Sequence, residues 1–153
     1  MLEQLAVSEG IQEQVHFAGP MFGAEKAALL ANAMAFVHTS RWEGMPFAIL
    51  EAMSMSAPVL LTRETNFGPI VEQYKAGHII SDGDDPKLVA AAFAKLEDAT
   101  DQSLAAMRMA ARRLVEENYT WKIIARKQAA LYAEALASPA TNGRTPVGVG
   151  SLA

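Results

Sequence analysis

Apolar and polar residues alternate along this chain with two periods, one typical of β-strands and one typical of α-helices. Short apolar runs predict four strands, at Val15–Ala18, Ala35–Thr39, Val59–Thr62 and His78–Ser81. Helical spacing predicts helices at Leu2–Gln12, Ala24–Asn32, Pro46–Met55 and Pro69–Lys75, and then at 86–98, 102–117 and 120–137. Because the two kinds of segment alternate, the pattern favours an α/β fold with a Rossmann-like parallel sheet, flanking helices and a helical C-terminus.

Capping and turn residues support several of these boundaries. Asp85 suits an N-cap with Pro86 at the first helical position, and Thr120 suits the cap of the last helix. Beyond Ala137 the sequence becomes small, polar and punctuated by Pro and Gly, which predicts a disordered tail at 138–153. The pattern therefore places one folded domain at 1–137.

Composition narrows the class of protein. The length of 153 residues suits one domain, and a hydrophobic fraction of 51% suits a buried core. The absence of cysteine excludes disulfides and thiolate sites, and the net charge of −4 argues against a nucleic-acid partner. No apolar run approaches the ~20 residues that cross a bilayer, and the first residues lack a signal-peptide pattern. We therefore expect a cytoplasmic protein with at most peripheral membrane contact.

Residues 40–61 contain the most informative local pattern. Glu43 and Glu51 stand eight positions apart, one on a loop and one on the helix that follows it. Pro46 suits the first helical position, because its φ is preorganised and its missing N–H would be unpaired there. The free N–H groups and positive dipole end of this helix would then face the loop, where a phosphate could bind. Ionised carboxylates only accept hydrogen bonds, so the two acids suit sugar or ribose hydroxyls.

The same segment resembles a known family signature. The run from Ser40 to Leu61 is similar to the E-x7-E motif of retaining GT-B glycosyltransferases of the family-4 type. The matching positions are Ser40, Glu43, Gly44 and Pro46 in the first half and Leu50, Glu51, Ala52, Met53, Pro58 and Val59 in the second. The resemblance extends over roughly Gln14 to Leu136 and implies the C-terminal, donor-binding domain of such an enzyme.

The resemblance also implies roles for individual residues. Glu43 would be the catalytic residue that contacts hydroxyls of the donor sugar, and Glu51 would hold the ribose hydroxyls of the nucleotide. The other implied donor- or nucleotide-binding residues are Gly19, Ser40, Gly44, Met45, Pro46 and Phe47, with the N–H groups of Met45 and Phe47 as candidate donors. The substrate would be a nucleotide sugar, transferred with retention and without metal or cofactor, in polysaccharide or glycoconjugate biosynthesis.

Parts of the family pattern have no counterpart in this chain. The family's first two strands are lacking, together with the Arg and Lys that neutralise the leaving diphosphate after its first strand. The acceptor-binding N-terminal domain has no counterpart either. We therefore expect a truncated domain that forms one wall of a cleft and is inactive in transfer by itself. Unpaired strand edges predict a partner or an oligomer.

Other interpretations stay open. A non-catalytic nucleotide-binding or interaction module of the same fold would have the same pocket. An oxidoreductase half would be expected to contain G-x-G-x-x-G after a strand, and this chain does not. A carboxylate-pair hydrolase is disfavoured by the lack of other acids around the motif. The particular sugar, nucleotide and acceptor do not follow from the sequence.

Several charged and titratable residues outside the motif indicate ordinary structural roles. The three histidines, His16, His38 and His78, fall on predicted strands that are not neighbours, which argues against a metal triad. Arg108, Arg112 and Arg113 indicate a solvated helix face. Asn66 lies on a loop after a predicted strand, near the expected site.

Overall fold

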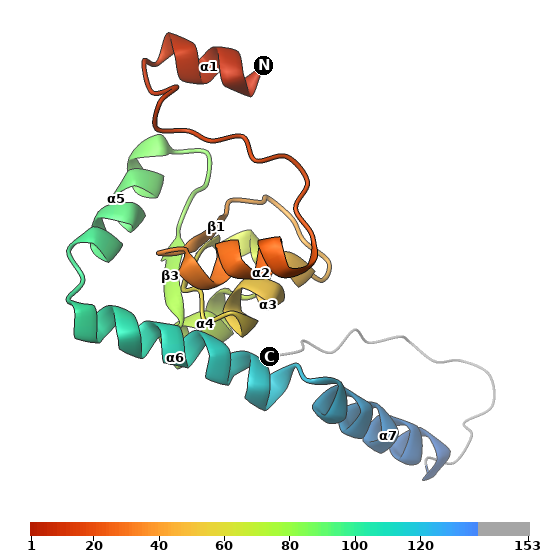
Figure 1. The fold of residues 1–153 in the computed structure, drawn as a ribbon. Helices are drawn as coiled ribbons and strands as arrows, with labels where there is room; N and C mark the ends of the chain where they lie inside the picture. Colours follow the sequence, from red (N-terminus) through yellow and green to blue (C-terminus); the bar gives the residue numbers. More distant parts are fainter. Residues whose placement is uncertain (138–153) are drawn as a thin grey trace.

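The computed structural model describes residues 1–137, in which three parallel strands form a sheet flanked by helices (Figure 1). The strands are β1 (Phe36–His38), β2 (Val59–Thr62) and β3 (Gly77–Ile80), in the spatial order β1-β2-β3. The helices are α1 (Leu2–Ser8), α2 (Gly23–Asn32), α3 (Phe47–Ser54), α4 (Gly68–Tyr74), α5 (Pro86–Glu97), α6 (Asp101–Asn118) and α7 (Trp121–Ala137), with a 3-10 turn η1 (Arg63–Thr65). The predicted α/β class with a parallel sheet and a helical C-terminus is confirmed.

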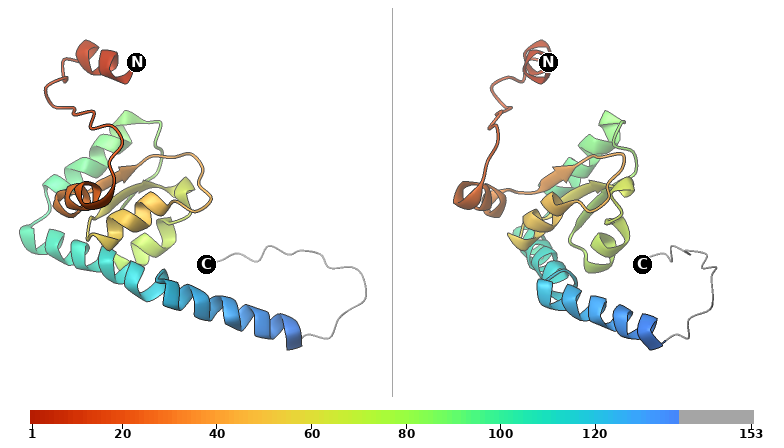
Figure 2. Two further views of the ribbon diagram at one scale, coloured as in Figure 1. Left: turned by 45° about the vertical axis from the view of Figure 1, so that its right-hand side comes forward. Right: turned by 90° about the vertical axis from the view of Figure 1, so that its right-hand side faces the viewer.

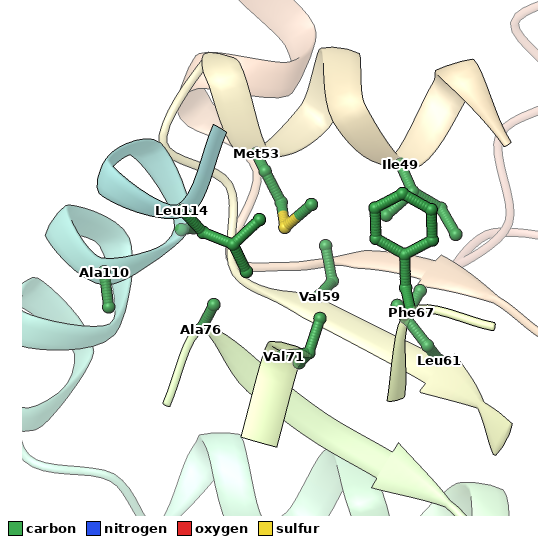
Figure 3. Close-up of a cluster of buried hydrophobic side chains, with 10 residues drawn as sticks. Ile49, Met53, Val59, Leu61, Phe67, Val71, Ala76, Ala110 and Leu114 are labelled. Carbon is green, nitrogen blue, oxygen red and sulfur yellow. The ribbon is translucent and has the colours of Figure 1, made fainter. Parts of the chain in front are cut away.

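The central strand β2 separates two apolar layers, because successive side chains of a strand point to opposite faces. Val59 and Leu61 are fully buried against α3, α4 and α6, in the larger cluster drawn in Figure 3. Leu60, from the same strand, packs on the other face with Leu96 of α5. All four β2 residues are buried, as expected for the middle strand of a parallel sheet with helices on both faces.

The parallel register brings three chain segments to one edge of the sheet. His38 pairs with Leu61, which in turn pairs with Ile79. Because all three strands run in the same direction, the loops that leave β1, β2 and β3 begin at the same edge. Open α/β sheets bind their ligands at this carboxyl edge.

The prediction of a strand at Val15–Ala18 is wrong. The structure has no strand there, and residues 11–20 are all exposed. A strand is stabilised by pairing and by burial of at least one face, and these residues have neither. The helix expected at Leu2–Gln12 is also shorter than predicted, because α1 ends at Ser8 and Gly10 adopts a positive φ of 69°.

A second correction concerns the start of α3. Pro46 has a ψ of 83°, which lies outside the helical range, so it is the N-cap and Phe47 is the first helical residue. The N-cap Asp85 is confirmed, since its side chain accepts from the Lys87 N–H at 2.8 Å.

The two ends of the described chain project from the sheet and its flanking helices (Figure 2). Helix α7 extends beyond α6 and has no buried residue, and α1 stands off at the other end of the molecule. Within residues 1–137, no helix combines the length and the apolar character that are needed to traverse a bilayer. The predicted disordered tail, 138–153, lies outside the described residues.

Candidate functional site

The motif loop leaves β1 at the carboxyl edge of the sheet and leads into α3. At its centre, Oε1 of Glu43 lies 2.7 Å from Nε2 of His38, the last residue of β1. Both side chains are about one quarter exposed. The bond to His38 holds the pKa of the Glu43 carboxyl below its usual range. The Ser40 hydroxyl lowers this pKa further, so at neutral pH Glu43 is a carboxylate held by His38 through Oε1.

The backbone of this loop is also held from the neighbouring strand. The Nδ2 group of Asn66 donates to the carbonyl oxygen of Glu43 at 3.0 Å, and Thr62 Oγ1 donates to the carbonyl oxygen of Ser40. Asn66 adopts a left-handed φ of 63°, a conformation that Asn tolerates better than most residues. Asn66 therefore lies beside the loop that contains Glu43, and its nearness to a binding site stays a prediction.

The N-terminus of α3 differs in detail from the sequence prediction. The Phe47 N–H donates to the Met45 carbonyl oxygen at 2.9 Å, so a ligand would have to displace that bond to use it. Pro46 is buried, whereas Trp42, Met45 and Phe47 are each more than half exposed. The loop and the first residue of α3 therefore expose three large apolar side chains within four positions of Glu43 in the sequence.

Glu51 lies on the exposed side of α3 and faces α2. Its Oε1 atom is 2.8 Å from Nζ of Lys26, and both side chains are partly exposed. The pair lines an open groove of about 290 Å³ between α2 and α3, whose other walls include Gly23, Leu30 and Met55. One carboxylate oxygen of Glu51 is thus engaged by Lys26, and the other can accept a further hydrogen bond.

Glu43 does not share the α2–α3 groove with Glu51. Glu51 lines the α2–α3 groove, whereas Glu43 lies at the end of β1 with His38. Gly19 lies on the exposed segment before α2, with a positive φ of 67°, and does not line the α2–α3 groove. The predicted binding roles of Gly19, Ser40, Gly44, Met45, Pro46, Phe47 and Glu51 therefore stay predictions, as does the catalytic role of Glu43.

Two residues of this region were not anticipated from the sequence. The sequence indicates only an ordinary structural role for His38, which the structure shows bonded to Glu43. Lys26 falls within the predicted helix Ala24–Asn32 and bonds to Glu51. The only sequence signal for His38 was its place at the end of a predicted strand, five residues before the motif acid. No local signal relates Lys26 to Glu51, because they are 25 positions apart.

Comparison with known proteins gives a consistent result. A family model described as "Glycosyl transferases group 1" matches residues 1–114. WcaL of Escherichia coli (strain K12), a glycosyltransferase named for colanic acid biosynthesis, is 35% identical over 91 residues, which are 58% of this chain and 22% of WcaL. The MMP alpha-(1->4)-mannosyltransferase of Mycolicibacterium hassiacum is 27% identical over 136 residues, which are 88% of this chain and 33% of that protein. The chain thus spans between about a fifth and a third of the length of these relatives.

Two solved structures share the fold. Sucrose-phosphate synthase from Thermosynechococcus elongatus superposes with a TM-score of 0.76 over 90% of this chain and 34% of the other, at 22% identity. WaaG, a glycosyltransferase involved in lipopolysaccharide biosynthesis, gives a TM-score of 0.69 over 84% of this chain and 34% of the other, at 21% identity. At these identities the likeness concerns the fold, and it agrees with the GT-B architecture expected from the motif. Together with the family model over residues 1–114, it shows that this chain belongs to the glycosyl transferases group 1 family.

Proposed function

We propose that this chain is the donor-binding part of a retaining, family-4-type glycosyltransferase that takes a hexosyl group from a nucleotide sugar. The main support is the placement of its E-x7-E segment. Glu43 is held at the carboxyl edge of the sheet by His38, and Glu51 projects from α3 into the open α2–α3 groove. Acceptor-only groups at a strand end and along a groove suit a ligand that presents hydroxyls at two places.

In this proposal the α2–α3 groove receives the nucleotide. Lys26 engages Oε1 of Glu51, which leaves Oε2 to accept a hydrogen bond from a ribose hydroxyl. The ammonium group of Lys26 would also place a positive charge beside the nucleotide phosphates. Because Glu51 neutralises Lys26, the groove as a whole is uncharged and does not replace the basic residues that the family carries after its first strand.

Glu43 would contact the donor sugar. His38 occupies one carboxylate oxygen, and the other is available to a sugar hydroxyl. The exposed Trp42 and Phe47 beside it offer apolar faces of the kind that pack against sugar rings. His38 acts on the substrate only through Glu43 and is therefore a positioning residue.

The chain by itself would bind donor without completing a transfer. It covers only 22% and 33% of the two curated relatives, so an acceptor-binding part would have to come from outside this chain. Within residues 1–137 strand β1 has no strand on its outer side, so that part, or a second copy, could complete the sheet there. The names of WcaL and WaaG favour a role in polysaccharide or glycoconjugate biosynthesis.

Calorimetry with UDP, GDP and ADP tests the proposal. We expect one of these nucleotides to bind and Glu51→Ala to weaken its binding by roughly tenfold or more, as for a hydrogen bond to a charged group. Glu72→Ala, which removes an exposed acid of α4 outside the groove, is the matched control and should leave affinity unchanged. No nucleotide binding at all, or equal affinity of the two variants, would contradict the assignment. Sugar transfer by the purified chain would contradict the idea that it is incomplete.

A further inference from the structure

A second cavity lies at the carboxyl edge of the sheet, where no role has yet been assigned. Its volume is about 310 Å³, and the loops that follow β1, β2 and β3 all contribute to its walls. We call it the rim pocket. It is separate from the α2–α3 groove and shares only Ser40 with the residues predicted to bind the donor.

The inner wall of the rim pocket is compact and rich in hydroxyl groups. Thr39, Thr62 and Ser81 line it, one from each strand end, and Thr62 is only 2% exposed. Gly83 packs so closely there that a Cβ atom would lie 2.5 Å from Cγ2 of Thr62 and 3.3 Å from Cβ of Thr39. The turn that follows β3 therefore closes directly over these two threonines, and a side chain at position 83 would have to displace it.

The outer wall is acidic. Glu64, Asp82 and Asp84 contribute three carboxylates, and Arg41 is the single cation among the lining residues. Arg41 is already paired with Asp84, through Nη2 at 2.9 Å and Nε at 3.2 Å from Oδ1. The lining therefore carries an excess of two negative charges at neutral pH. An anionic ligand such as a phosphate or a nucleotide is disfavoured by this charge.

The remaining chemistry is that of hydrogen bonding to neutral hydroxyls. Carboxylates accept from hydroxyl groups, and the hydroxyls of Thr39 and Ser81 can both donate and accept, whereas the Thr62 hydroxyl already donates to the Ser40 carbonyl oxygen. Asp82 is fixed in direction because it accepts from the Asp84 N–H at 2.9 Å, and Asp84 is fixed by Arg41. Preorganised acceptors of this kind bind a polyhydroxylated ligand without a large ordering cost.

We propose that the rim pocket is a binding site for a neutral saccharide. The pocket lies beside Ser40, at the start of the motif loop, and is a saccharide site of the donor-binding part itself, separate from any acceptor-binding part outside this chain. Saccharide binding there does not depend on the proposed function. The two ligands would then lie on different sides of the motif loop, the nucleotide in the α2–α3 groove and the saccharide in the rim pocket.

Chemical-shift mapping of backbone amides in the full chain tests the proposal. The probes are glucose, methyl α-mannoside and maltose at millimolar concentrations, with glucose 6-phosphate as the charged counterpart of glucose. We expect at least one neutral probe to shift the amides of residues 81–84 and 40–41, and the phosphorylated sugar to shift them less. Glu64→Ala and Ser81→Ala should each weaken this binding about fivefold or more. Ser54→Ala, in the α2–α3 groove, is the control and should not change it.

The outcomes separate the two proposals. The rim pocket assignment is overturned if no neutral probe shifts residues 81–84, if both variants bind as well as the wild type, or if glucose 6-phosphate binds as well as glucose. It is also overturned if calcium chloride, and no saccharide, causes the shifts. A parallel titration with UDP, GDP and ADP reports on residues around Lys26 and Glu51. Saccharide binding without nucleotide binding would support the rim pocket and contradict the nucleotide site. Nucleotide binding without saccharide binding would support the nucleotide site and contradict the rim pocket.

Discussion

His38 and Glu43 form a direct contact of 2.7 Å between Nε2 and Oε1 at the carboxyl edge of the sheet. His38 belongs to β1, whose backbone is fixed by pairing with β2, whereas Glu43 belongs to the loop that follows. The contact therefore transfers the rigidity of the sheet to a side chain on a loop. Asn66 holds the backbone of the same residue from the β2 side. A loop carboxylate held at two points is preorganised for its ligand.

The His38–Glu43 contact makes a prediction about donor discrimination. His38→Phe removes the group that donates to Glu43. The quantity of interest is the ratio of the affinity for a nucleotide sugar to the affinity for the free nucleotide, which we call the gain. We expect the gain to fall roughly fivefold to tenfold in His38→Phe. His38→Gln can still donate from a similar position and should retain most of that gain. Affinity for the nucleotide alone should be equal in all three proteins. Calorimetry with the nucleotide sugar and with the free nucleotide measures the gain for each protein. An unchanged gain in His38→Phe would contradict a positioning role for His38.

Arg108 is predicted to be important for stability. The sequence suggested a solvated helix face, but its guanidinium donates to the carbonyl oxygens of Ala31, Ala33 and Ser56. These bonds tie α6 to the end of α2 and to the turn after α3. We expect Arg108→Met to lower the free energy of unfolding by about 2 kcal/mol, and Arg112→Met, on the exposed side, by less than about 0.5 kcal/mol. Urea denaturation of both variants compares them, and equal midpoints would refute the assignment.

Ser56 is predicted to be a strained position. It adopts a φ of 62° in the turn between α3 and β2, in the left-handed region that favours glycine. We expect Ser56→Gly to raise the free energy of unfolding by about 0.5–1 kcal/mol, because the left-handed penalty exceeds the entropic cost of glycine. Ser54→Gly, at the last residue of α3, should instead lower the free energy of unfolding. Thermal and urea unfolding would measure both changes, and a destabilised Ser56→Gly would show that the turn carries no such strain.

His78 is predicted to make stability depend on pH. Its burial, and then the charge of Lys95, lower the pKa of His78 below the ordinary value of 6.5. The unfolded chain therefore binds a proton at this residue more readily than the folded protein. The contribution of His78 to stability is fully present above the pKa of the unfolded chain. It is lost as the pH falls from about 6.5 towards the lower pKa of the folded protein.

The midpoint of urea unfolding, measured between pH 7.5 and pH 5.5, tests this dependence. We expect the midpoint to fall on acidification in the wild type and to fall less in His78→Asn. His16→Asn, which changes a histidine of the exposed segment before α2, is the control and should follow the wild type. Parallel curves for the wild type and His78→Asn would mean that His78 does not contribute.

The outcome of the sequence predictions differs between local and long-range features. The segments around Val59–Thr62 and 86–97 were predicted well, because a short apolar run and an Asp-Pro cap are local signals. Val15–Ala18 has the same apolar character but forms no strand, because a strand needs a partner that its own residues do not provide. The sequence around Arg108 does not predict its three carbonyl partners, because they lie between 52 and 77 positions away along the chain.

The sequence by itself determined the class of the fold, because hydrophobic periodicity and helix caps are properties of consecutive residues. The spacing of Glu43 and Glu51 is a local property of the same kind. The tertiary structure decided which side chains act together. Only the parallel register of the strands places His38 beside Glu43 and gathers the loops after β1, β2 and β3 around one pocket. Only the packing of α2 on α3 brings Lys26 to Glu51. These contacts depend on how the chain folds between residues that are distant in the sequence, and a local sequence pattern does not predict them.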